Sequence, residues 1–472
     1  MHRCCIGFAL FAKKKYIYLQ RINTYTLMIR KLVVWSMVVL FASGYTACKK
    51  AELTVETPKS EEQADTRTVA DATAEQRTRG EVLAIATQLA RGDSKGKTRA
   101  VPDFDVEYVL TSAVQKERFM AIGLAPVDTM LYILNERDGS GFSLISGDKR
   151  IPELLAYSDE GHLDIRHVDN PGLAIFLSRL PIFFEQELMK SDRVKREHFK
   201  EVPKEPPIVK YTDWKTTYRT LNAVPVCWEQ DSPFNNDAPI REGKRAKAGC
   251  AATAVAQLLA AHKFPTAWYN SPPIDWTFLT REKYCYRYHD ADRIRFEKEI
   301  APLFLRLGNA LKNDWGAYET GAKSERIPII LREMGYKTPS RLAPFKSSEV
   351  YYDLYHGNPI IMRGYEEEYT KGWWFIKWKE HKGGHVWLSD GYLQQERTRS
   401  VVSQDGEVLS SEVEYRHLLH CNWGWGNSTN GYFLPGVFDS HNPIEPDLNN
   451  ITTGKTPGYF QYVVEQLIDV HP

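Results

Sequence analysis

The chain has 472 residues, with 61 Lys or Arg against 60 Asp or Glu, so its formal net charge is +1 at pH 7. This balance excludes the strongly basic surface on which nucleic-acid or anionic-membrane binding depends, and no nucleic-acid partner is expected. The length predicts two or three domains, and the apolar and charged fractions are those of ordinary globular proteins.

The amino-terminal residues predict export. Residues 28–31 form a short basic start, and residues 32–42 form an apolar run that is too short to span a bilayer. The run ends in small residues before Cys48, which resembles a bacterial lipoprotein signal in which that cysteine is lipidated. We therefore expect a signal region over residues 1–48 with the true start at Met28, and an outer-membrane or cell-surface lipoprotein. Plain secretion, or release to the periplasm after maturation, is the alternative.

Residues 49–79 are polar and contain no aromatic side chain. Such a segment cannot bury enough apolar surface to fold, so it is expected to be a flexible tether that holds the remainder away from a membrane.

Residues 80–195 have the pattern of a small α+β domain. A helix is expected over residues 82–90, and a second helix, with proline near its start, over 171–188. Short strands are expected at residues 108–110, 120–124, 130–134 and 142–145. Taken alone, this domain has the character of a binding module.

Residues 196–210 form a linker rich in charge and proline. Because proteolysis concentrates in exposed, extended segments, we expect a maturation cut between residues 190 and 215. A passive connection between domains is the alternative.

Cys250 follows a glycine at the start of a segment of small and apolar residues that is expected to be a buried helix. The free N–H groups and positive dipole end of a helix favour a thiolate, which is the reactive form of cysteine. Cys250 is therefore a candidate nucleophile, the alternative being a small buried apolar residue.

Two downstream motifs supply candidate partners for this thiol. His385 follows paired glycines at the start of a predicted strand, and Asn422 lies in a tryptophan- and glycine-rich motif. Cysteine, then histidine, then asparagine is the order found in papain-like proteases. The Cys250–His385 separation of 135 residues falls within the roughly 130–150 typical of papain and cathepsins.

The motifs around these residues resemble those of the streptopain family, a bacterial branch of the papain-like cysteine proteases made as inactive zymogens. The matching segments are residues 248–257, 262–265, 384–392 and 422–426, with residues 142–148 and 154–161 resembling the inhibitory propeptide. The resemblance implies an α+β fold in which a papain-like two-lobed catalytic domain, residues 211–472, follows a small α+β propeptide, residues 80–195.

The same resemblance implies roles for individual residues. His385 takes the proton of Cys250 and later protonates the leaving amine, Asn422 orients the imidazole, and Trp423 shields that contact. Gln230 is the candidate oxyanion donor, together with the backbone N–H of Cys250. The expected substrate-binding residues are Gly321, Ala322 and Gly384. Gln257, which follows Cys250 on the same helix face, is expected to be structural and to bond a buried backbone group.

Other chemistry finds less support. No phosphate-binding glycine loop or serine elbow occurs, and no metal or other cofactor is expected. A disulfide between Cys227 and Cys285 is one option for an exported protein, although spacing alone does not establish it. The expected function is a cysteine endopeptidase acting on protein or peptide substrates, with its own propeptide as inhibitor. A cell-wall or isopeptide amidase and an inactive binding module on the same fold are the alternatives.

Overall fold

The computed structural model describes residues 55–56, 75–92, 102–121, 126–198, 208–220, 222–268, 271–373, 376–426, 429–439 and 464–472. They all belong to one compact unit, Thr54–Pro472. The expected signal region with Cys48, most of the tether and residues 199–207 of the linker lie outside the described residues. Among the helices that are described, none is both long enough and apolar enough to cross a membrane.

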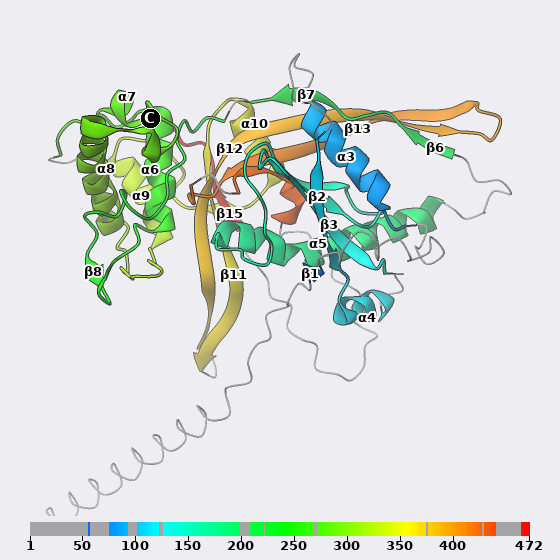
Figure 1. The fold of residues 1–472 in the computed structure, drawn as a ribbon. Helices are drawn as coiled ribbons and strands as arrows, with labels where there is room; N and C mark the ends of the chain where they lie inside the picture. The colour runs from blue at the N-terminus through cyan, green and yellow to red at the C-terminus, as the bar shows by residue number, and fades with distance from the viewer. Residues whose placement is uncertain are drawn as a thin grey trace, which may run out of the picture. The chain divides into compact units, whose positions relative to one another are not determined.

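The first part of the chain forms an antiparallel meander with three helices (Figure 1). Its elements are β1 (Val55–Glu56), α3 (Arg79–Gly92), β2 (Phe104–Leu110), α4 (Ala113–Ala121), β3 (Thr129–Glu136), β4 (Phe142–Ser146), β5 (Leu154–Ser158) and α5 (Pro171–His198). The strand expected at residues 120–124 is wrong, because Met120 lies in α4. A capping box explains the helix: the backbone N–H of Gln115 donates to Ser112 Oγ, and that of Ser112 donates to Gln115 Oε1.

The second part of the chain has a helical lobe and a sheet lobe. The helical lobe contains β8 (Ile240–Arg241), β9 (Lys244–Arg245), α6 (Cys250–His262), α7 (Trp276–Leu279), η1 (Cys285–Arg287), α8 (Asp290–Ala310), η2 (Ser324–Arg326) and α9 (Ile327–Glu333). The sheet lobe contains β6 (Ile208–Tyr211), β7 (Lys215–Arg219), β10 (Ala343–Pro344), α10 (Ser347–Tyr355), β11 (Ile360–Trp373), β12 (Ile376–Val402), β13 (Val408–Asn422), β14 (Gly431–Phe433), η3 (Pro435–Val437) and β15 (Val464–Leu467). The predicted α+β class is confirmed.

A single sheet joins the two parts. Strand β5 pairs antiparallel with β14, with Tyr157 opposite Tyr432 and Ala156 opposite Phe433. Among the described strands, the order runs β1-β2-β3-β4-β5-β14-β13-β12-β11-β15-β10, with β6 and β7 paired to β12. The amino-terminal meander therefore continues the sheet of the following lobe.

Helix α6 forms the centre of the helical lobe. Its residues from Ala251 to Ala260 are all buried, and its small side chains let α8 and β12 pack closely against it. Trp228, Phe234 and Phe304 complete the same core. Because α6 also contacts β12, the helix connects the two lobes at the point where Cys250 begins it.

The linker is shorter than the sequence suggested. Helix α5 continues to His198, and β6 begins at Ile208 and pairs with β12 through Val209 opposite Val401. Strand β6 runs beside the extended β12–β13 hairpin (Figure 1).

Candidate active site

Cys250 is the first residue of α6, as the sequence predicted. The preceding Gly249 has φ 92°, which favours glycine, and no side chain caps the helix. A Cβ on Gly249 would stand 3.2 Å from both Asn313 Nδ2 and Thr320 Cγ2. Glycine is therefore suited to this position for two reasons: it adopts the positive φ of the turn, and it leaves room for Asn313 and Thr320 to pack against the start of the helix.

The chain before the cysteine is fixed by hydrogen bonds from two other segments. The amide of Asn313 donates to the Ala248 carbonyl at 3.1 Å, and the Thr320 hydroxyl donates to that of Lys247 at 2.7 Å. The backbone N–H of Ala248 donates to the Gln230 carbonyl at 2.9 Å. Gln230 is buried, and its backbone carbonyl bonds to the segment that precedes Cys250, while its role as an oxyanion donor stays a prediction.

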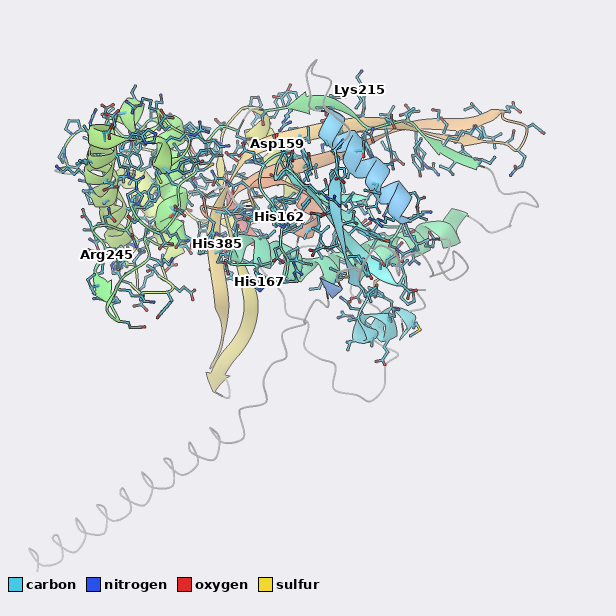
Figure 2. The ribbon with its side chains drawn as sticks, in the orientation of Figure 1. Asp159, His162, His167, Lys215, Arg245 and His385 are labelled. Carbon is cyan, nitrogen blue, oxygen red and sulfur yellow. The ribbon has the colours of Figure 1, made fainter. Side chains whose placement is uncertain are left out.

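His385 lies on β12, opposite Gly364 of β11, and is 1% exposed (Figure 2). Its Nε2 is 2.8 Å from the backbone oxygen of Trp423, so this nitrogen carries the proton and donates. The imidazole stacks on Trp387 with ring centroids 6.2 Å apart, and it meets Trp425 edge-on. A backbone acceptor and aromatic rings therefore set the orientation of the ring.

The thiol lies beside the strand that carries His385. Burial raises the pKa of Cys250, while hydrogen bonding from the backbone of Val386, Ala251 and Cys250 itself acts to lower it. Cys250 packs against the apolar core to which Val386 of β12 belongs, and α6 is in contact with β12. Burial also lowers the pKa of His385 to about 4, against a smaller opposite effect of the Trp423 carbonyl. At neutral pH this state therefore holds a neutral imidazole and a protonated thiol.

Asn422 does not contact His385 as the sequence analysis expected. Its Nδ2 donates to the carbonyl of Val226 at 3.2 Å and to Gln257 Oε1 at 3.1 Å, while its Oδ1 accepts from the backbone N–H of Gly424 at 3.2 Å. In this closed state the Nε2 of His385 has its acceptor in the next residue, the carbonyl of Trp423, and the orienting role of Asn422 stays a prediction. No side-chain motif in the sequence signals a main-chain acceptor of this kind.

Gln257 completes this support from α6. Its Oε1 accepts from the backbone N–H of Trp228 at 3.0 Å, and its amide pairs with that of Asn422. The prediction that Gln257 bonds a buried backbone group agrees with this contact. The buried amide pair thus joins the nucleophile helix to the strand end that leads into Trp423.

Helix α5 of the amino-terminal domain covers the histidine. A Cβ on Gly172 would stand 2.3 Å from Trp423 Cε3 and 2.9 Å from His385 Cδ2, so the helix backbone rests directly on both rings. Asn170 caps this helix by accepting from the backbone N–H of Gly172 at 3.0 Å. The Nδ2 of Asn170 also donates to Thr429 Oγ1 at 2.7 Å, in the loop whose carbonyl at Thr429 accepts from the Trp423 indole. An Asn-Pro pair could signal the helix start from sequence, but not its contact with the site.

The expected substrate-binding residues lie in two segments, the loop with Gly321 and Ala322 and the strand β12 with Gly384. Gly321 exchanges backbone hydrogen bonds with Asp314, and Ala322 packs partly buried against the helical core. Their loop is held to the segment before Cys250 by the Thr320–Lys247 bond. Gly384 lies next to His385 on β12, where a Cβ would stand 2.8 Å from the ring of Tyr365.

The remaining described cysteines differ from Cys250. Cys227 and Cys285 are not joined by a disulfide in the structure, and Cys421 also forms none. Burial raises the pKa of Cys227 to about 12 and that of Cys421 well above its usual value. In the parts of the chain that are described, no group of three or more His, Cys, Asp or Glu residues could hold a metal ion.

Two family models match separate parts of the chain. Residues 228–433 match the Peptidase C10 family, and residues 111–181 match the Spi protease inhibitor family. Streptopain of Streptococcus pyogenes is 22% identical over 379 residues, which cover 72% of this chain and 81% of streptopain. The chain is a streptopain-family cysteine protease. It is an endopeptidase made as a zymogen, with an inhibitory domain before the catalytic one.

Further relatives of this protease come from other bacteria. The thiol protease/hemagglutinin PrtT of Porphyromonas gingivalis is 23% identical over 369 residues, 73% of this chain and 37% of PrtT. Among solved structures, a prointerpain A fragment of Prevotella intermedia aligns with TM-score 0.44 and 20% identity, covering 71% of this chain and 94% of the fragment. Active interpain A aligns with TM-score 0.31 and 21% identity, covering 46% and 87%.

Proposed function

We propose that Cys250 and His385 are the nucleophile and the general base of this endopeptidase, and that α5 is the element that keeps them inactive. One observation carries the proposal: α6, which begins at Cys250, packs against β12, where His385 is held through Nε2 by the Trp423 carbonyl. That bond leaves Nδ1 as the ring nitrogen available to a proton from the thiol.

Removal of α5 gives water access to His385 and restores its basicity. The imidazole then takes the thiol proton, and the thiolate adds to a peptide carbonyl. Collapse of the adduct breaks the C–N bond as His385 protonates the leaving amine. Water, deprotonated by His385, hydrolyses the thioester and regenerates the thiol. The negative oxygen of each adduct is held by the backbone N–H of Cys250 and the side chain of Gln230.

Asn422 and Trp423 support this cycle without taking part in it. Asn422 fixes the turn at Gly424, which presents the Trp423 carbonyl to the histidine. The Trp423 ring packs on Trp387 and excludes water from the imidazole. Gly321, Ala322 and Gly384 are proposed to border the substrate peptide.

The proposed domain boundaries follow the elements. The inhibitory domain occupies residues 80–198, and the catalytic domain begins at Ile208 because β6 is already part of its sheet. Maturation therefore cuts between α5 and β6, at residues 199–207, inside the 190–215 window expected from the sequence.

Export and anchoring are proposed from the amino-terminal sequence. Residues 28–47 would act as a signal peptide, and Cys48 would receive the lipid that holds the protein at a membrane surface, with residues 49–74 as the tether. Mass spectrometry of the membrane fraction before and after Cys48→Ser tests this. Retention of the unmodified Cys48→Ser chain in that fraction would contradict lipid anchoring at this position.

The catalytic proposal is tested by casein cleavage with residues 50–472 under reducing conditions, beside a Cys250→Ala chain. We expect the native chain to shorten within 199–207, cleave casein and be blocked by a thiol alkylator, while Cys250→Ala stays full length and inert. Shortening only after added trypsin would place activation in another protease. Casein cleavage that survives Cys250→Ala would overturn the assignment.

The alternative chemistry is tested in the same preparation. A cell-wall amidase would release amines from purified peptidoglycan and leave casein intact, whereas a binding module would leave both intact. The family match favours neither alternative.

A further inference from the structure

Three carboxylates of the inhibitory domain form ion pairs with lysine and arginine side chains of the catalytic domain. They belong to one short stretch, residues 153–160, which contains β5 and the turn after it and is called here the acidic segment. Its partners are separated widely in sequence, from Trp214 to Arg416. The acidic segment therefore shows what this face of the catalytic domain binds.

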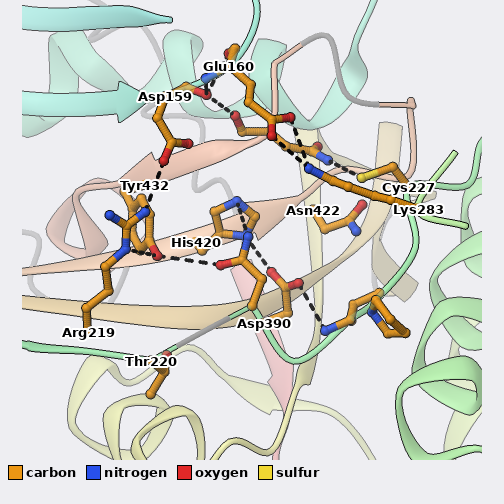
Figure 3. A pocket seen from close by; sticks show the side chains of 15 residues that line it. Asp159, Glu160, Arg219, Thr220, Cys227, Lys283, Asp390, His420, Asn422 and Tyr432 are labelled. Atoms are coloured by element: carbon orange, nitrogen blue, oxygen red, sulfur yellow. Dashed lines mark hydrogen bonds and ion pairs between the residues drawn. The ribbon is translucent and has the colours of Figure 1, made fainter. Parts of the chain in front are cut away.

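One end of the acidic segment meets Lys283. Its ammonium lies 2.9 Å from Glu160 Oε1, and the hydroxyl of Tyr284 donates to Glu160 Oε2 at 2.8 Å. Beside them, Asp159 pairs with Arg219 at 3.2 Å. Both ion pairs, Glu160–Lys283 and Asp159–Arg219, border a cavity of about 360 Å³ (Figure 3).

Polar side chains of the catalytic domain also line this cavity. His420 Nδ1 lies 2.6 Å from Asp390 Oδ1, and its Nε2 lies 3.2 Å from Asn222 Nδ2. Asn422 and Asn430, which support the catalytic loop, also line it. The cavity thus borders residues that hold the Trp423 backbone in place.

The other end of the acidic segment meets two arginines. Glu153 pairs with Arg416 at 3.0 Å and Arg397 at 3.3 Å, and it accepts from the indole N–H of Trp214. Both guanidinium groups lie 4.4 Å from the centre of the Trp214 ring. All three partners belong to the part of the chain that follows the proposed cut.

Between these ends the acidic segment binds through its backbone. Strand β5 pairs with β14, and the backbone N–H of Leu434 donates to the Leu155 carbonyl at 2.9 Å. The Ser158 hydroxyl donates to the Asn430 carbonyl at 2.7 Å. Departure of the inhibitory domain therefore leaves an open strand edge with a cationic group at each end, and an open edge is a template for another extended chain.

We propose that this face of the matured protease, formed by the β14 edge, Lys283, Arg397 and Arg416, is an exosite that binds an extended acidic segment of a protein substrate. The inference rests on the proposed maturation. Backbone pairing along β14 selects a peptide rather than a nucleic acid, and the cations select carboxylates. Because α5, and not the acidic segment, covers His385, a peptide bound here leaves Cys250 and His385 open to a second part of the same substrate.

The test uses enzyme matured from the full chain and then blocked with a thiol alkylator. The probe is a fluorescein-labelled peptide with the sequence of residues 152–161, compared with one carrying Gln, Asn and Gln in place of Glu153, Asp159 and Glu160. Anisotropy should show the acidic peptide binding about tenfold more tightly at low salt, with the difference shrinking as salt rises. Arg397→Gln, which removes a partner of Glu153, should remove most of the preference, and Lys283→Gln should reduce it only slightly. Lys298→Gln, which removes an exposed lysine on α8, should keep it. Equal binding of the two peptides would overturn the exosite.

A competition assay with unblocked enzyme separates this exosite from the active-site cleft. The acidic peptide should slow cleavage of casein, an acidic protein, and leave a small fluorogenic peptide amide unaffected. Equal inhibition of both substrates would place the peptide in the cleft and contradict the proposal. Failure of the catalytic assignment looks different, because cleavage of both substrates would then persist after alkylation of Cys250.

Discussion

At the residue scale, the histidine is oriented by a main-chain carbonyl that depends on buried amides behind it. Gln257 and Asn422 are both at most 2% exposed and bond to each other, to Trp228, to Val226 and to Gly424. A backbone acceptor has no side chain to mutate. Its placement must therefore be tested through the residues that hold the turn.

We predict that Asn422→Ala and Gln257→Ala lower kcat/KM by a similar factor, about 10- to 100-fold, and that the double variant is little worse than either. Each change breaks the same amide pair and loosens the turn that presents the Trp423 carbonyl. Each should also cost about 1–3 kcal/mol of unfolding free energy, because buried polar groups lose their partners. Steady-state kinetics and thermal unfolding of the matured variants provide the measurement.

A different pattern would restore the direct role first expected for Asn422. If Asn422→Ala alone impairs catalysis while Gln257→Ala leaves kcat/KM unchanged, then Asn422 reaches His385 once the inhibitory domain has left. Asn422→Asp is the matched variant, since it keeps the acceptor for Gly424 and loses the two hydrogen bonds that the amide donates to Val226 and Gln257.

At the element scale, the proposed inhibition by α5 depends on close contact between its first turn and the rings of Trp423 and His385. Asn170 fixes the start of the helix, and Gly172 allows its backbone to touch Trp423 and His385. Since Gly172 is already helical and its φ is not in the left-handed region, alanine fits the backbone there, and only the contact resists it.

We predict that Gly172→Ala weakens inhibition and speeds maturation. The new Cβ would stand 2.3 Å from the Trp423 ring, so the helix must move outward or the ring must shift. Gly80→Ala on α3 is the control, because its Cβ would meet nothing closer than 4.0 Å. The measurement is the rate at which purified full-length chain shortens under reducing conditions. An unchanged rate for Gly172→Ala would show that this contact does not limit maturation.

The ion pairs of the acidic segment should differ in their effects. The side chains of Glu160 and Lys283 are 45% and 40% exposed, so their ion pair stabilises the closed state by only about 0–1 kcal/mol. Glu160→Gln should therefore speed maturation only slightly. Glu153 is 15% exposed, against 10% for Arg416, and burial lowers the pKa of that arginine to about 10. Glu153→Gln leaves the buried guanidinium of Arg416 without its carboxylate partner in the inhibitory domain. It should therefore speed maturation by at least tenfold. Equal rates for the two variants would contradict this order.

The sequence could predict the elements whose patterns are local. The Cys250 helix, the His385 strand and the α5 start were all marked by periodicity, glycine or proline. Met120 was misassigned because an apolar run over 120–124 resembles a strand, and the Ser112–Gln115 capping box decides otherwise. The Trp423 carbonyl and the β5–β14 pairing were beyond prediction, since both are backbone contacts between distant segments and leave no side-chain pattern.

At the scale of the whole molecule, the inhibitory and catalytic domains share one sheet and part of one core. Val82 and Leu89 of α3 belong to the same apolar cluster as Leu393, Leu418 and Tyr432 of the sheet lobe. Departure of the inhibitory domain must therefore expose apolar surface as well as break β5 from β14. Such a closed state is stable, and an external condition that weakens it would control when the protease becomes active.

Protonation of His385 supplies one such condition, and we predict that acid loosens α5. Burial lowers the histidine pKa from 6.5 to about 4 in the closed state, whereas an opened site gives an ordinary value. A lowered histidine pKa means that the closed state is fully favoured above about pH 6.5 and loses stability as pH falls toward 4, by up to about 3 kcal/mol. Hydrogen exchange of α5 in the inert Cys250→Ala chain, corrected for intrinsic rates, should show protection at pH 7.5 that falls at pH 4.5. The same comparison in Cys250→Ala/His385→Phe isolates the histidine from interface carboxylates such as Glu153, because phenylalanine fills the site without titrating. Equal loss of protection in both chains would assign the acid response to the carboxylates, and only a loss confined to the histidine-bearing chain supports His385 as the proton acceptor that opens the zymogen.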